Sequence, residues 1–134
     1  MIRIGKAAWE AMQSHAEENY PEEACGACMG LVGANGDPLI RISLRLINRA
    51  TDPRTHYECD LDPAYWLAAR TELQFLGIYH SHADADAFFS SHDIEQSAPW
   101  FFHLVLSIHR AKFKEASCWW PREGLAMAAD FEIR

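Results

Sequence analysis

Hydrophobic positions recur with a helical period in the first segment of the chain. Over residues 6–18 they return at spacings of three and four, at Trp9, Met12, His15 and Ala16. This spacing places one apolar stripe along a single face, because a helix completes a turn every 3.6 residues. The pattern predicts a helix over residues 6–18.

Two apolar segments separated by turn-forming residues come next. Residues 25–32 are nearly all apolar, and residues 39–46 alternate apolar with polar side chains. Between them, residues 33–38 read Gly-Ala-Asn-Gly-Asp-Pro, and glycine, asparagine and proline favour tight turns. Together these features predict a β-hairpin.

The second half of the chain alternates between helical and extended patterns. A helix is expected over residues 62–74, where apolar positions at helical spacing run through Tyr65, Leu67, Ala69 and Leu73. The other predicted elements are a strand over residues 76–82, a short helix opening near Ser91, and strands over residues 101–109, 113–120 and 125–132. Helices and strands that alternate around a mostly β core predict an α/β fold with a mixed sheet.

Length and charge narrow the classes of function. The 134 residues suit one domain spanning residues 1–134, and 49% hydrophobic with 23% charged residues is typical of a globular protein. Twelve Lys and Arg stand against nineteen Asp and Glu, a formal net charge of −7. Nucleic-acid binding is therefore not expected, because it draws its affinity from clustered basic residues.

Membrane insertion and disulfide bonds are not expected either. No apolar stretch approaches the roughly 18–20 residues that span a bilayer, and the first ten residues lack the apolar region of a secretory signal. A cytoplasmic location is the resulting expectation. The cysteines are then expected to be reduced thiols, at Cys25, Cys28, Cys59 and Cys118.

Two histidines on one predicted strand are candidate metal ligands. His80 and His82 point to the same face, because side chains alternate across a sheet, so both rings can reach one ion. A catalytic zinc site usually has three protein ligands. Asp93, eleven residues beyond His82, can supply the third, but the spacing from Ser90 to Asp93 is also that of a helix capping box. His92 is expected to point elsewhere on that helix.

A metal hydrolase also needs a carboxylate that is not a ligand, to move a proton between water and the leaving group. Glu22 and Glu23 lie where the first predicted helix gives way to the apolar segment at residues 25–32. Glu23 is nearer that segment, where partial burial would shift its pKa. The alternative is that both glutamates are solvated linker residues.

These residues together match a known pattern. His80-Ser-His82, seven residues, Ser90, two residues and Asp93 resemble the H-S-H-x7-S-x2-D motif of the JAMM (MPN-plus) zinc metalloproteases. The segment from Pro21 to Gly26 resembles the P-x-E-x-C-G segment that bears the family's glutamate. The resemblance extends from the first helix to the strand at residues 101–109. It implies the family's cytidine-deaminase-like α/β/α fold.

The resemblance also implies roles for individual residues. One zinc ion per chain would be bound by His80, His82 and Asp93, with Glu23 as general base and then acid, and with Ser90 stabilising the oxyanion. Small bacterial members are associated with ubiquitin-like sulfur-carrier proteins, so the implied partner is the C-terminal Gly-Gly tail of such a carrier. The motif usually continues with proline, whereas Ala83 stands here, which leaves the rigidity of the following loop and the substrate preference in question.

Some of the same residues also fit other functions. A deaminase pattern, His15-Ala-Glu17 followed by Cys25 and Cys28, is rejected because too few residues separate its two halves and no proline precedes Cys25. A redox pair is rejected because Cys25 and Cys28 lie in a predicted strand and point to opposite faces. A non-catalytic MPN-type scaffold and a zinc hydrolase of another small amide both stay open, as does a homodimer.

Overall fold

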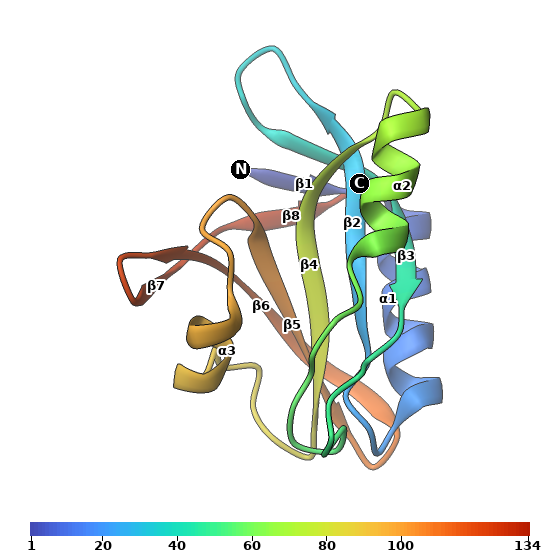
Figure 1. Cartoon of the computed structure of the whole chain (residues 1–134), viewed down its shortest axis with the longest axis vertical. Helices are drawn as coiled ribbons and strands as arrows, with labels where there is room; N and C mark the ends of the chain where they lie inside the picture. Colours follow the sequence, from blue (N-terminus) through green and yellow to red (C-terminus); the bar gives the residue numbers. More distant parts are fainter.

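The computed structural model describes residues 1–134 and contains three helices and eight strands (Figure 1). The helices are α1 (Lys6–Asn19), α2 (Asp62–Arg70) and α3 (Ser91–Gln96). The strands are β1 (Ile2–Ile4), β2 (Cys25–Val32), β3 (Pro38–Leu46), β4 (Gln74–Ala83), β5 (Phe102–His109), β6 (Lys112–Arg122), β7 (Leu125–Ala128) and β8 (Phe131–Ile133).

All eight strands form one mixed sheet in the order β7-β6-β5-β4-β2-β3-β1-β8. β4 and β5 are parallel, whereas β4 is antiparallel to β2. Only residues 129–130 separate β7 from β8 in the chain, although the two strands are the opposite edges of the sheet. The sheet therefore curls until its edges approach each other, as the right-handed twist of strands allows.

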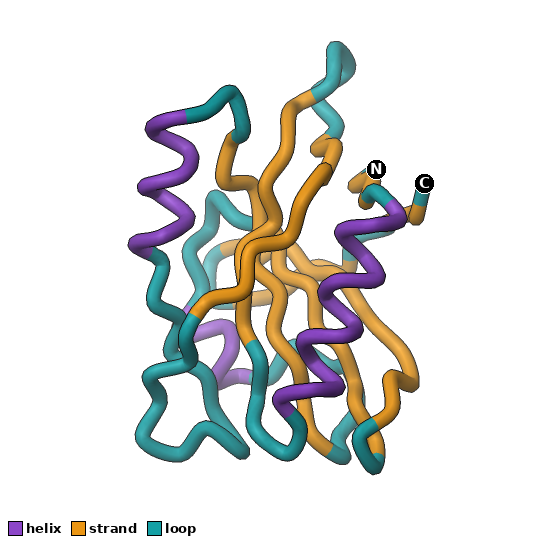
Figure 2. The backbone as a smooth tube through the Cα atoms, turned by 90° about the vertical axis from the view of Figure 1, so that its right-hand side faces the viewer, coloured by secondary structure: helices purple, strands orange, loops and turns teal.

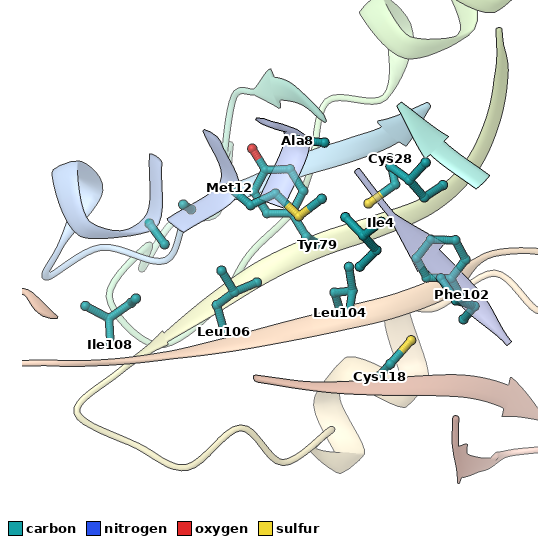
Figure 3. Packing of buried hydrophobic residues seen from close by; sticks show 14 residues of the cluster. Ile4, Ala8, Met12, Cys28, Tyr79, Phe102, Leu104, Leu106, Ile108 and Cys118 are labelled. Carbon is teal, nitrogen blue, oxygen red and sulfur yellow. The ribbon is translucent and has the colours of Figure 1, made fainter. Parts of the chain in front are cut away.

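The sheet lies between helices on both faces, so the architecture has α/β/α layers. In Figure 2, α1 lies on one side of the strands and α2 on the other. The α1 face holds the largest core cluster, in which Met12 of α1 packs with Tyr79 of β4 and Leu104 of β5 (Figure 3). The fold class expected from the sequence is confirmed.

Close packing at two glycines fixes how β4 meets its neighbours. Gly26 lies opposite Tyr79, and a Cβ at this glycine would lie 2.2 Å from the tyrosine ring. Gly77 lies opposite Phe102 in the same way, at 2.4 Å. Only glycine leaves room for the two rings, so these positions secure the register of the central strands.

Most predicted elements are confirmed, with corrections at four places. β1 was not foreseen, since three residues are too short for a period. The strand expected over residues 125–132 is two strands, because the chain crosses from one sheet edge to the other at residues 129–130. β4 begins at Gln74, two residues before the predicted strand.

The helix expected over residues 62–74 ends at Arg70. The Thr71 hydroxyl donates a hydrogen bond to the Leu67 carbonyl and accepts one from the Leu73 amide, so it replaces the next helical turn. Two of the four residues expected on the buried face, Leu67 and Leu73, do pack in the core, but Tyr65 is exposed. Ala69 is exposed as well, and the face that packs on the sheet is Ala64, Leu67 and Ala68.

The four cysteines are free thiols, as expected. Cys25 packs in the cluster under α2, and Cys28 packs in the cluster under α1, so the two side chains do point to opposite faces of the sheet. None of the helices has the length and apolar character required to cross a bilayer.

Candidate active site

The C-terminal end of β4 carries the two histidines of the H-S-H motif. Their Nε2 atoms lie 3.2 Å apart, and both rings lie on the face opposite α1. Between them, Ser81 points to the other face, where its hydroxyl accepts a hydrogen bond of 2.8 Å from the Ala24 amide. Ser81 therefore ties the histidine strand to the segment that begins β2.

Asp93 reaches the same place from the first turn of α3. Its Oδ2 lies 3.3 Å from His80 Nε2 and 3.2 Å from His82 Nε2. The same oxygen accepts a hydrogen bond from the Ser90 amide, and the Ser90 hydroxyl accepts one from the Asp93 amide. The sequence left two alternatives for Asp93, a capping residue or a neighbour of the histidines. The structure shows both. The cap orients the carboxylate toward the two rings.

These three donor atoms form a nearly equilateral triangle with edges of 3.2–3.3 Å. Zinc binds such atoms at about 2.0–2.1 Å, so the edge of its coordination tetrahedron is about 3.3–3.4 Å. The triangle therefore has the dimensions of one face of a zinc tetrahedron. Two imidazoles with one carboxylate are also a donor set that suits zinc.

Hydrogen bonds and stacking fix the two rings. The Asp86 carbonyl accepts a hydrogen bond of 2.8 Å from His82 Nδ1, which leaves Nε2 of this ring as the atom with a free lone pair. His80 is fully buried, and the ring of Tyr57 stacks on it with centroids 4.1 Å apart. Both rings are therefore held in place before any ligand binds.

Burial and mutual contact shift the pKa values of the three residues of the triangle. Burial lowers the pKa of His80 and outweighs the opposing effect of Asp93. Burial also lowers the pKa of His82, but the Asp93 carboxylate and the Asp86 carbonyl raise it more, so the net pKa is above the usual value. Burial raises the pKa of Asp93, yet both histidines lower it further, and the carboxylate stays ionised.

Glu23 lies beside this triangle at the start of β2. It is 5% exposed, and its Oε1 has no hydrogen-bond partner. Desolvation raises its pKa to about 8, and the nearby His82 lowers it only partly. The alternative of a solvated linker residue is therefore wrong for Glu23, but Glu22 is exposed as that interpretation required. A buried carboxyl group with a raised pKa is suited to give and take a proton near neutral pH.

Glu23, His80 and His82 also present donor atoms within 4.8 Å of one another. This is a second, wider set that could hold a metal ion. The triangle with Asp93 is tighter, and it leaves the glutamate free beside it.

The loop between β3 and α2 anchors the backbone of Glu23. The Glu23 amide donates a hydrogen bond of 2.6 Å to the Pro53 carbonyl, and its own carbonyl accepts one of 2.9 Å from Asn48 Nδ2. Sequence reasoning missed this loop, although Asn48 lies two residues after a predicted strand and Tyr57 is the one tyrosine, tryptophan or phenylalanine between residues 47 and 60. Arg54 lies in the same loop and lines one pocket with Glu23. No sequence pattern indicates this, because the two residues meet only when the loop folds back toward the start of β2.

A pocket of about 270 Å³ opens on these groups. Its lining is Glu23, Arg54, Thr55, His82, Ala83, Ala85, Ser90 and Asp93. The Ser90 hydroxyl uses its oxygen as the acceptor for the cap, so its hydrogen stays available to a third group. All five residues singled out by the motif thus meet at one place, with fully buried His80 behind the pocket.

The loop over residues 84–89 is held by hydrogen bonds instead of proline. Its carbonyls at Ala85, Asp86 and Ala87 accept hydrogen bonds from Ser107, His82 and Ser117, respectively. Side chains of β4, β5 and β6 thus hold three consecutive carbonyls of the loop that follows Ala83.

His92 does not join the triangle. Its Nε2 lies 3.0 Å from Gln96 Nε2, and its ring packs on that of His56 with centroids 4.3 Å apart. The expectation that it points elsewhere on α3 is confirmed.

An α/β/α domain with two histidines and two carboxylates gathered at the end of a central strand defines a JAB/MPN-type domain. The chain belongs to the family described as prokaryotic homologs of the JAB domain, which matches residues 5–122. The JAMM/MPN resemblance found in the sequence is thereby confirmed.

Relatives and solved structures agree with this family. The chain is 27% identical to desampylase from Haloferax volcanii over 114 residues, 79% of this chain and 80% of that protein. A protein from Salinibacter ruber has a TM-score of 0.78 at 26% identity, covering 100% of this chain and 92% of that one. A JAB1/MPN domain protein from Archaeoglobus fulgidus shares the fold, with a TM-score of 0.64 at 13% identity over 99% of this chain and 97% of its own.

Proposed function

We propose that this protein is a zinc metallopeptidase that hydrolyses the amide bond after the C-terminal Gly-Gly of a ubiquitin-like sulfur-carrier protein. The observation that carries the proposal is the triangle of His80, His82 and Asp93 with edges of 3.2–3.3 Å beside buried Glu23. The likeness to desampylase supports a hydrolase that acts on a ubiquitin-like protein.

His80, His82 and Asp93 would hold the metal ion, one per chain. When bound, zinc supplies a Lewis acid that polarises the substrate carbonyl and acidifies water. Asp93 is the better third ligand than Glu23, because its oxygen is equally close to both histidines and its position is fixed by the cap. Glu23 then remains available for proton transfer.

Glu23 takes a proton from the attacking water through the oxygen that has no partner in the protein. Water adds to the carbonyl carbon of the last glycine, and the C–N bond to the following residue breaks. Glu23 returns the proton to the leaving amine, which its raised pKa of about 8 favours. The Ser90 hydroxyl donates a hydrogen bond to the oxyanion that develops on the glycine carbonyl.

The pocket favours glycine next to the scissile bond. Its volume is about 270 Å³ and its rim includes Thr55, Ala83 and Ala85, so a peptide backbone must come close to the histidines to react. Glycine permits this approach because it has no side chain to clash. The tail would reach the metal site as an extended strand. β4 itself has a partner strand on each side, so it offers the tail no free edge of its own.

The test is intact-mass analysis of ubiquitin-like sulfur carriers from the same organism, each extended beyond Gly-Gly by one or a few residues. We expect the zinc-loaded protein to trim a carrier back to its Gly-Gly end. The Glu23→Gln protein serves as the matched control, because it keeps the proposed ligands.

Three outcomes would contradict the proposal in different ways. Hydrolysis of unrelated peptides or of a small amide, with no carrier trimmed, would keep the chemistry and reject the carrier. Absence of both metal and activity would favour a non-catalytic scaffold. Equal cleavage after the second glycine is replaced by alanine would reject the narrow pocket as the source of selectivity.

A further inference from the structure

The pocket that contains Glu23 also contains one cationic side chain. Among its lining residues only Arg54 is a lysine or arginine, whereas Glu23 and Asp93 are both carboxylates. The chain as a whole has a net charge of −7. An arginine at this place therefore stands out, because the proposed hydrolysis assigns it no role.

Hydrogen bonds on both sides of Arg54 fix its backbone near Glu23. The preceding residue, Pro53, accepts the hydrogen bond of the Glu23 amide. Two residues further on, the His56 carbonyl accepts a hydrogen bond of 3.0 Å from Asn48 Nδ2, the group that also donates to the Glu23 carbonyl. Arg54 is thus tethered to the same residue that is proposed to protonate the leaving amine.

The guanidinium of Arg54 has no partner in the protein. It takes part in none of the ion pairs, and none of its nitrogens donates a hydrogen bond to another residue. Arg49 in the same loop is different, since two of its nitrogens bond Asp60 at 2.9 and 3.2 Å. Arg54 therefore offers a planar pair of donors to a molecule that enters the pocket.

We propose that Arg54 is a specificity-determining residue that pairs with the free α-carboxylate of the amino acid released from the carrier. This inference rests on the proposed function and adds what the enzyme recognises on the leaving side of the bond. It predicts that the preferred substrate carries one residue after Gly-Gly, with an unblocked C-terminus.

The covalent geometry of the leaving amino acid explains why Glu23 and Arg54 could act on the same residue of the substrate. In a single leaving residue, the leaving nitrogen and the carboxyl carbon are separated by bonds of about 1.46 and 1.52 Å, so they lie about 2.5 Å apart. A group that protonates this nitrogen therefore lies close to the carboxylate as well. Each additional residue moves the carboxylate about 3.3–3.6 Å further from the leaving nitrogen, so a single leaving residue brings the carboxylate nearest to Glu23 and to the arginine beside it.

The products follow from the same hydrolysis. The oxygen of water ends on the carboxyl group of the carrier's last glycine, the C–N bond breaks, and the amine of the released amino acid receives the proton from Glu23. The carboxylate bound by Arg54 is unchanged in the reaction. Its interaction is made with the substrate as well as with the transition state, so it affects KM and kcat/KM more than kcat.

The experiment compares one carrier with a single added alanine in two forms, with a free C-terminal carboxylate and with a C-terminal amide. Cleavage is followed by intact mass with the wild type, Arg54→Gln, Arg54→Lys and Arg49→Gln. We expect the wild type to prefer the free acid by about 10- to 100-fold in kcat/KM, the scale of a hydrogen bond to a charged group. Arg54→Gln lowers kcat/KM for the free acid by this factor and for the amide by much less, so the preference is lost. Arg54→Lys retains part of the preference, and Arg49→Gln behaves as the wild type.

A binding measurement separates recognition from catalysis. Calorimetry of the two carrier forms with the Glu23→Gln protein, with and without Arg54→Gln, is expected to show the same preference in Kd. Equal Kd values for acid and amide in the Glu23→Gln protein, or equal kcat/KM values in the wild type, would overturn the inference while the proposed function stands. An equal fall in kcat for both forms on Arg54→Gln would assign Arg54 to the oxyanion instead. If no extended carrier is bound or cleaved, the proposed function fails, and the inference fails with it.

Discussion

The two faces of β4 bury polar side chains in opposite ways. On the α1 face, the Tyr79 hydroxyl and His15 Nδ1 lie 2.7 Å apart inside the largest apolar cluster, and each satisfies the other. On the opposite face, Glu23 Oε1 and His80 Nδ1 are buried without any hydrogen-bond partner. The same strand therefore separates a closed polar pair from an open polar cluster.

This difference distinguishes structural from functional burial. A buried polar group left without a partner costs about 1–3 kcal/mol, so a fold retains few of them. The α1 face avoids this cost, because Tyr79 and His15 pair with each other within the core. The other face keeps open donors and acceptors where a pocket gives access to them, as expected where a metal ion and a substrate complete the bonding. Five predictions test this contrast.

The largest effect is expected for metal binding. His82→Ala should lower the zinc content from about one ion per chain to near zero, because it removes one corner of the triangle. His92→Ala is the matched control, since that ring contacts Gln96 and His56 instead. Elemental analysis of both proteins measures the effect. Full zinc content in His82→Ala would remove this residue from the ligand set.

The next largest effect concerns turnover. Glu23→Gln should lower kcat by at least about 100-fold, the usual scale for a general acid and base, while the zinc content is kept. Glu22→Gln, which changes an exposed side chain, should leave kcat unchanged. Loss of zinc from Glu23→Gln would instead favour the ligand set of Glu23, His80 and His82.

Substitutions on the α1 face of the sheet should lower the stability of the protein and leave metal binding unchanged. Met12 is fully buried against the sheet, so Met12→Ala should lower the free energy of unfolding by about 2–5 kcal/mol. Urea titration measures this loss, and zinc analysis at 25 °C is expected to give the wild-type value for the folded protein. A fall in zinc content in a folded Met12→Ala protein would mean that the two faces are coupled.

His15 should make the closed face sensitive to acid. Burial, and then the charge of Arg45, lower its pKa to about 4 in the folded protein, from an unfolded value near 6.5. The unfolded chain therefore binds the proton first, and stability that is full above pH 6.5 is lost as the pH falls toward 4. The expected loss from His15 is about 2 kcal/mol between pH 7 and pH 5.

Urea titration of the wild type and His15→Gln at these two pH values measures that loss. The substitution should remove about 2 kcal/mol of the pH dependence. A remainder is expected from His103, whose pKa is also lowered to about 4 by burial. The same pH dependence in both proteins would show that His15 is not the group responsible.

The smallest effect is a change of stability that separates the two tasks of Asp93. Asp93→Ala should lose the hydrogen bond that its carboxylate accepts from the Ser90 amide, at a cost of about 1 kcal/mol of stability, and it should lose the zinc as well. Asp93→Asn keeps an oxygen that accepts the hydrogen bond of the Ser90 amide but has no charge for a metal, so it should lose zinc with little loss of stability. Thermal unfolding and elemental analysis of both variants give the two readouts. Normal zinc content in either variant would leave Asp93 as a cap alone.

Local pattern was enough to predict many elements of this protein. α1 follows from a period of 3.6 and β3 from a period of two, because each period reflects which side chains a regular element turns toward the core. β2 follows instead from a nearly continuous apolar run that turn-forming residues end. The spacing of His80 and His82 also placed both rings on one face of a strand. The prediction of α2 was less accurate, since the Thr71 hydroxyl ends the helix through a contact that no hydrophobic period records.

The tertiary structure alone decided what completes the site. Asn48, Pro53 and Tyr57 contact Glu23 or His80 across more than twenty residues of chain, and such contacts leave no period in the sequence. Sequence spacing also left Asp93 open between a cap and a ligand, because a carboxylate in the first turn of a helix can take either role. The sequence determines which side chains each element can present, through local geometry. Only the folding of distant segments against one another determines which of those side chains meet and which are left without a partner.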